Sequence, residues 1–187
     1  MSKIVFILFG SFVFCAIASA QVPTSGNVFF GYSYNNTSLP GFDRTGTNGW
    51  EASLEGKFLP FIGIVADFDT HYGSYGIPVA VTCPINIVNC GSNLSGDFTE
   101  HNYLFGPRAS VSVGKIRPFA EVLIGAGHVH TNFGASDTSF ATAIGGGIDY
   151  KFFKLLAWRL QGDYIHTNFF DVAQNNVRIS TGIVVRF

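Results

Sequence analysis

The side chains that could perform chemistry are the histidines and the serines and carboxylates near them. A histidine held by an acid can activate a serine hydroxyl as a nucleophile. The histidines all lie toward one end of alternating segments, at heights comparable with several acids: His71, His101, His128, His130 and His166, with Asp67, Asp69, Glu100 and Asp163. Such pairs often come close by chance in a sheet. The pattern therefore favours polar packing over catalysis, and we predict no catalytic residue.

Two of these histidines also raise the question of a metal. His128 and His130 are alternate residues, so on a strand both side chains point the same way. A protein zinc site uses three or four ligands, and no third ligand stands out beside them. We predict no metal site and no cofactor.

The first twenty residues have the pattern of an export signal. Lys3 gives a positive start, residues 4–17 are apolar, and Ala18-Ser19-Ala20 supplies small residues for cleavage before Gln21. The apolar run is shorter than the roughly 20 residues that a transmembrane helix needs. We therefore predict a signal peptide over 1–20 and a single domain over 21–187.

Export bears on the cysteines that remain after cleavage. Cys83 and Cys90 are separated by six residues, and an exported protein with two cysteines favours a disulfide between them. A zinc site is the alternative. It would need further cysteine or histidine close by, and that stretch has none.

The composition suits a lipid-facing surface. Charged residues make up 12 % of the chain, against roughly 25 % in soluble domains, while the chain has 20 Phe and 22 Gly. Removing Lys3 leaves ten of the eleven basic residues against twelve acidic ones, which is too acidic for a nucleic-acid partner. No segment after Ala20 is long enough for a transmembrane helix, so a membrane crossing would require closed sheet.

Alternation of apolar with polar residues indicates strands. Between 50 and 58, Trp50, Ala52 and Leu54 share one face, and Glu51, Ser53 and Glu55 share the other. The same pattern predicts strands over 27–34, 50–58, 62–72, 98–114, 118–130, 139–151, 155–166 and 176–187.

The connections alternate in length. Short ones cover 59–61, 115–117 and 152–154, and long ones cover 35–49, 73–97 and 131–138, with an intermediate one at 167–175. Outer-membrane barrels have this pattern, with turns in the periplasm and loops outside.

The charges bear on which face is inside. A soluble barrel or sandwich would bury the apolar faces, whereas a membrane barrel would bury the charged ones. Acids dominate the second and third strands and arginines lie on other strands, so a closed interior can pair them, as buried charges require. We predict a polar network in the lumen made of Glu51, Glu55, Lys57, Asp67, Glu121, Asp149, Arg159, Asp163, Arg178 and Arg186.

The last predicted strand carries a family resemblance. Val177, Ile179, Thr181, Ile183, Val185 and Phe187 share one face, and the last residue is aromatic. This resembles the C-terminal strand of bacterial outer-membrane proteins, whose terminal Phe is read by the barrel-assembly machinery. The whole domain resembles the OmpA/OmpX-type family. The resemblance implies an all-β fold, an eight-stranded antiparallel up-and-down transmembrane β-barrel in the Gram-negative outer membrane, with Phe187 as assembly signal and no active site.

The function expected from this resemblance and from the strand pattern is an envelope-structural or surface-interaction role. Its partners would be outer-membrane lipid, the barrel-assembly machinery and an extracellular ligand at the loops, of which 73–97 is the longest. One alternative is an outer-membrane lipid-modifying enzyme that uses His128, His130 or His166. The other is a soluble periplasmic ligand-binding barrel.

Overall fold

The structure is a computed structural model that describes residues 25–37, 44–79 and 92–187. Its strands are β1 (Gly26–Thr37), β2 (Thr45–Lys57), β3 (Ile62–Val79), β4 (Ser92–Ser110), β5 (Ile116–Thr131), β6 (Ser136–Lys151), β7 (Leu156–Thr167) and β8 (Gln174–Arg186). A short 3-10 turn, η1 (Phe169–Asp171), precedes β8. The predicted signal peptide over 1–20 and the pair Cys83 and Cys90 lie outside the described residues.

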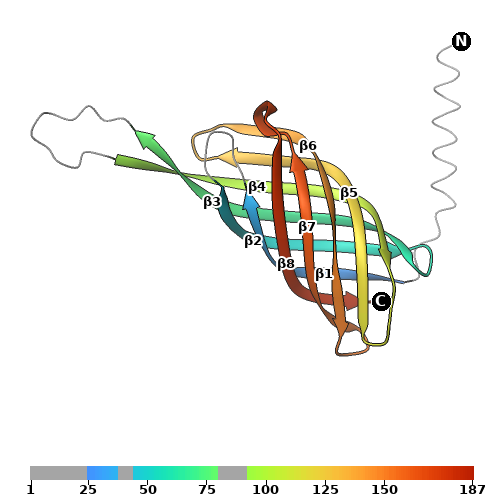
Figure 1. Ribbon diagram of the computed structural model, residues 1–187. Coiled ribbons are helices and arrows are strands. Elements are labelled where there is room, and N and C mark those ends of the chain that lie inside the picture. Colours follow the sequence, from blue (N-terminus) through green and yellow to red (C-terminus); the bar gives the residue numbers. More distant parts are fainter. Residues whose placement is uncertain (1–24, 38–43, 80–91) are drawn as a thin grey trace, which may run out of the picture.

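The strands close into a barrel. Each strand pairs antiparallel with the next, and β8 pairs with β1, from Asn27 opposite Arg186 to Asn36 opposite Val177. Figure 1 shows the tilted strands wrapping around one axis. Closure removes the unpaired edges that an open sheet would expose. The prediction of an eight-stranded antiparallel up-and-down barrel is confirmed.

The two ends of the barrel differ. The connections 58–61, 111–115 and 152–155 lie at one end, which we call the turn end, and the opposite ends of the strands define the loop end. Gly114 has a φ of +62°, a left-handed conformation that glycine adopts readily, and it helps the chain reverse between β4 and β5. The start of β1 and the end of β8 meet at the turn end, where the Gly26 amide donates to the Phe187 carbonyl oxygen at 2.9 Å.

The longest hairpin differs from its prediction. β3 and β4 stay paired as far as Val79 opposite Ser92, although β2 stops pairing at Tyr72 and β5 at Phe98. Residues 73–79 and 92–97 thus form a two-stranded extension, the β3–β4 ribbon, which projects beyond the barrel in Figure 1. The prediction of a loop over 73–97 was wrong for these residues, because backbone pairing outside the barrel does not need apolar alternation.

The barrel is apolar outside and polar inside. Large outward side chains are well exposed, including Phe30 (61 %), Phe140 (65 %) and Ile144 (60 %), while inward residues such as Arg159 and Asp149 are fully buried. A soluble barrel has the opposite arrangement, so the apolar faces do not form an ordinary core. No helix within residues 25–37, 44–79 and 92–187 is long and apolar enough to cross a membrane.

Candidate functional site

One group of charges surrounds Arg178 in the loop-side half of the lumen. The Arg178 cluster consists of Arg178 and the four acids Glu51, Asp67, Asp69 and Asp163, all with fully buried side-chain ends. Arg178 Nη1 lies 2.8 Å from Asp67 Oδ1 and also bonds Asp69, and Nη2 lies 2.9 Å from Asp163 Oδ2. These residues come from β2, β3, β7 and β8, so one guanidinium group links four strands of the barrel.

A second group of charges occupies the turn-side half. The Arg108 cluster consists of Arg108, Arg117, Arg159, Glu55, Glu121 and Asp149. Arg108 lies 2.5 Å from Glu121 and 3.3 Å from Glu55, and Arg117 lies 2.5 Å from Glu55. Arg159 Nε lies 2.7 Å from Asp149. Because its charges balance, this cluster satisfies the requirement that buried ions be paired.

Neutral side chains fill the space around the two clusters. The Gln161 amide donates to Glu51 at 3.2 Å and to Glu121 at 3.0 Å, which links the clusters. The Phe119 ring lies under two guanidinium groups, with Arg108 Cζ 4.4 Å and Arg159 Cζ 4.6 Å from its centroid. A further group of inward residues is apolar: Val65, Leu104, Leu123, Ala141, Ala143 and Ile165.

Eight of the predicted lumen residues lie buried in these clusters: Glu51, Glu55, Asp67, Glu121, Asp149, Arg159, Asp163 and Arg178. Two lie at the turn end and are less buried. Arg186 is 21 % exposed and lies 3.3 Å from Asp149, and Lys57, the last residue of β2, is partly exposed.

Other members of the interior were not predicted from the sequence. Arg117 was assigned to a turn, but it lies on β5 and bonds Glu55. Its spacing was the available signal, since Arg117, Phe119 and Glu121 are alternate residues and share the inward face. Also absent from the predicted network are the buried residues Asp69, His71, Glu100 and Asn102.

One buried chain of hydrogen bonds has the connectivity of a hydrolytic triad. His71 Nδ1 lies 3.0 Å from Asp69 Oδ1, and His71 Nε2 lies 2.9 Å from Ser33 Oγ. In serine hydrolases this order of groups activates the hydroxyl. Here all three residues are fully buried, Asp69 also bonds Arg178, and Ser33 accepts from Ser180 at 2.9 Å. The chain therefore lies inside the packed lumen, where its hydroxyl has no exposed surface.

The other histidines lie on the outside of the wall near the loop end. Three of them use Nδ1 to bond a neighbouring strand: His101 to Thr70 at 2.9 Å, His128 to Thr138 at 2.7 Å and His166 to Asn175 at 2.8 Å. His130 is exposed on β5. Within the part of the chain that the structure describes, no three or more histidine, cysteine or acidic side chains are placed to hold a metal ion.

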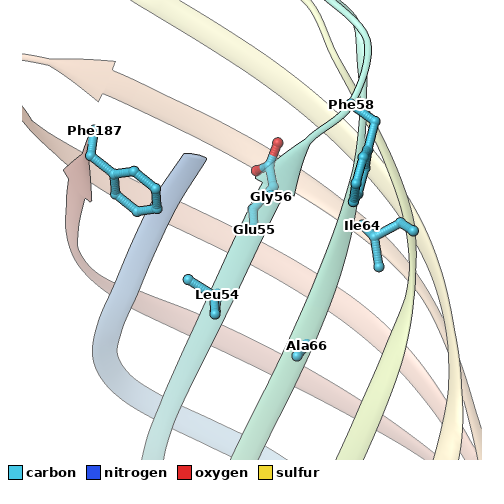
Figure 2. A pocket seen from close by; sticks show the side chains of 7 residues that line it. All are labelled: Leu54, Glu55, Gly56, Phe58, Ile64, Ala66 and Phe187. Carbon is cyan, nitrogen blue, oxygen red and sulfur yellow. The ribbon is translucent and has the colours of Figure 1, made fainter. Parts of the chain in front are cut away.

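Phe187, the predicted assembly signal, lies at the turn end against β1. Its amide donates to the Gly26 carbonyl oxygen at 3.1 Å, and its ring is 59 % exposed on the outer wall. A Cβ on Gly26 would lie 2.3 Å from the Glu55 carbonyl oxygen and 2.8 Å from the Phe187 ring, so a larger residue would clash with both. Figure 2 shows Phe187 beside an apolar hollow whose lining includes Leu54, Phe58 and Ile64. Recognition of Phe187 by the assembly machinery stays a prediction.

Comparison with known proteins identifies the fold. No family model matches the chain, and no curated protein matches it. Among solved structures it is similar to Ail, the attachment invasion locus protein of Yersinia pestis, with 16 % identity over 87 % of this chain and 98 % of that one and a TM-score of 0.53.

Two further structures agree with this comparison. Neisserial surface protein A has 11 % identity over 87 % of this chain and 96 % of that one, with a TM-score of 0.59. The outer membrane protein OprG from Pseudomonas aeruginosa has 9 % identity over 89 % of this chain and 97 % of that one, with a TM-score of 0.61. The predicted resemblance to small OmpA/OmpX-type barrels is thereby confirmed at the level of the fold.

Proposed function

We propose that this chain, with the fold of a small outer-membrane β-barrel, is an integral outer-membrane protein of a Gram-negative cell with an envelope-structural or surface-interaction role. The observation that carries the proposal is the distribution of side chains on the barrel wall: the outer surface is apolar and the inner surface is charged. A contiguous exposed apolar surface marks an interaction or membrane site. A belt of apolar surface around a closed barrel suits the hydrocarbon core of a bilayer.

The strand dimensions support insertion. A transmembrane strand needs about 9–11 tilted residues, and β7 has 12. Its outward residues Trp158, Leu160 and Tyr164 are apolar or aromatic, and His166 follows at the loop end. This order, apolar in the middle and polar at the rim, suits a band with aqueous borders.

The packed lumen favours a role as a membrane anchor and argues against a role as a pore. An eight-stranded barrel has an interior just wide enough for side chains to fill it. Here the Arg178 and Arg108 clusters cross-link opposite walls, because Arg178 on β8 reaches Asp67 on β3 and Arg117 on β5 reaches Glu55 on β2. We infer a rigid wall that does not admit solutes of sugar size.

The β3–β4 ribbon is the part that such an anchor would display. It continues the paired strands beyond the wall at the loop end. That end would face the cell exterior if the short turns lie in the periplasm, as they do in outer-membrane barrels. A predicted disulfide between Cys83 and Cys90 would restrict the connection beyond the ribbon and lower the ordering cost of binding. The proposed partners are outer-membrane lipid, the assembly machinery at the C-terminal strand and an extracellular ligand at this ribbon.

The test is a pair of arginine substitutions on one strand, Ile144→Arg and Ser136→Arg. Both residues face outward on β6, Ile144 in its middle and Ser136 at its loop end. In a bilayer an arginine at the midplane costs about 2–4 kcal/mol and one near the interface about 0–1 kcal/mol. We expect Ile144→Arg to reduce the heat-modifiable, folded protein in the outer-membrane fraction, and Ser136→Arg to leave it unchanged. Equal behaviour, with the protein in the soluble fraction, would support the soluble barrel instead.

The second candidate function is an enzyme, favoured by the Ser33–His71–Asp69 chain alone. A serine activated in this way reacts with fluorophosphonates. Because Ser33 is fully buried, we expect no labelling of the folded barrel. Labelling that disappears in Ser33→Ala would instead establish a hydrolase. Lipid A analysis of His128, His130 and His166 variants tests the lipid-modifying alternative.

A further inference from the structure

Two histidines face each other on the outer wall between β4 and β5. His101 and His128 are register partners, and both side chains point outward, because their neighbours Glu100, Asn102 and Val129 are buried in the lumen. Directly opposed residues of antiparallel strands have Cβ atoms about 4.5–5.5 Å apart. Two imidazoles at that separation can ligate one ion between them.

The flanking strands orient both rings. Thr70 on β3 is the register partner of His101, and Thr138 on β6 is the register partner of His128, so four strands form the row Thr70, His101, His128, Thr138. Each threonine hydroxyl lies within 2.9 Å of its partner's Nδ1. When Nδ1 donates this hydrogen bond, Nε2 keeps its lone pair for a metal. Metal-binding histidines commonly have their second nitrogen held in this way.

A neighbouring ring further restrains His101. Phe68 stacks on it with 6.5 Å between centroids and 13° between planes. Toward the turn end, the next outward residues are Tyr103 on β4 and Ala126 on β5; toward the loop end they are Thr99 and His130. The pair therefore lies where the apolar wall gives way to polar residues. Both histidines are partly exposed, so an ion can reach them from the aqueous side.

We propose that His101 and His128 form a two-histidine site for a divalent transition-metal ion on the outer wall of the barrel. Imidazole nitrogen suits copper, nickel and zinc, and affinity for such a site rises toward Cu²⁺. Water completes the coordination, since the described residues bring no group of three such ligands together. The ion would clamp β4 to β5 at the base of the β3–β4 ribbon. The site does not depend on what the ribbon binds.

The test is metal binding by untagged, folded protein in detergent, with Cu²⁺ and Zn²⁺ each measured by competition with a chromophoric chelator. We expect one ion per barrel. His101→Gln and His128→Gln should each weaken binding about tenfold or more, because losing a ligand should cost at least as much as the roughly 10–100-fold lost when a ligand's outer-shell partner is replaced. Heat modifiability shows that each variant is folded.

His166→Gln is the matched control. His166 also faces outward at the loop end with Nδ1 bonded to Asn175, but its register partners are Thr142 and Asn175 instead of a second histidine. It should bind like the wild type, and so should His130→Gln. Unchanged affinity in His101→Gln, or an equal loss in His166→Gln or His130→Gln, would overturn the assignment.

Discussion

Replacing Arg178 by methionine should lower the free energy of unfolding by about 3–5 kcal/mol, the loss found when one partner of a buried ion pair is removed. Methionine keeps an unbranched side chain of similar length but removes the charge and its donors. The matched control is Arg44→Met, because Arg44 is exposed and its guanidinium donates to the Asn175 carbonyl oxygen. A surface change of that kind should stay within about 0.5 kcal/mol.

The size of the effect comes from how many carboxylates share this one cation. Arg178 lies 2.8 Å from Asp67, 2.9 Å from Asp163 and 3.5 Å from Glu51, and it also bonds Asp69. Removing it leaves these acids buried together without a compensating charge. The loss should therefore lie at the upper end of the range. Arg178→Lys should lose less, because an ammonium keeps the charge but not the planar fork that serves several acids at once.

The assay is urea unfolding in detergent or lipid, monitored by the fluorescence of the two tryptophans, Trp50 and Trp158. The midpoint and slope together give the free energy of unfolding. Equal stability of Arg178→Met and Arg44→Met, within about 0.5 kcal/mol, would refute this role of Arg178. That result would mean that the four acids do not depend on the guanidinium.

Three further predictions concern the barrel wall, the predicted assembly signal Phe187 and the cysteines. Gly125→Ala should lower the free energy of unfolding by about 1–3 kcal/mol, because its Cβ would lie 1.9 Å from a backbone oxygen of β4. Gly162→Ala should be neutral, because its Cβ would meet nothing nearer than 4.0 Å. Equal losses of stability in urea unfolding would contradict this steric argument. Phe187→Ala should reduce the heat-modifiable protein in the outer membrane without lowering the yield of folding into detergent in vitro. A similar loss in vitro would assign Phe187 a packing role instead. Alkylation and mass analysis should find Cys83 and Cys90 blocked before reduction and free after it, and free thiols in exported protein would exclude the disulfide.

The sequence predicts strands well where the wall separates two environments. On β7 the alternation of Trp158 and Leu160 with Arg159 and Gln161 follows the boundary between outward-facing and lumen-facing positions. It fails in the β3–β4 ribbon, because there both faces lie outside the barrel and the pattern loses its period. Gly and Pro in that stretch are typical of loops, although the backbone stays paired to Val79.

The sequence predicted which residues face the interior of the barrel. It did not predict which of them contact one another. Alternation alone places Asp67 and Arg178 on inward faces. Their contact joins residues 111 positions apart on strands that are not neighbours. It depends on barrel diameter and on the stagger between strands, and neither is encoded locally. The same holds for Ser33 and His71, which meet across β2.

The pairing of β8 with β1 has a consequence for synthesis. The strand that follows the other seven along the chain supplies Arg178 and Ser180 to the lumen and also closes the ring. A chain that stops before β8 would keep two open strand edges and would leave the buried acids around Arg178 without that cation. We therefore expect truncated chains to be degraded by proteases that the full-length protein resists.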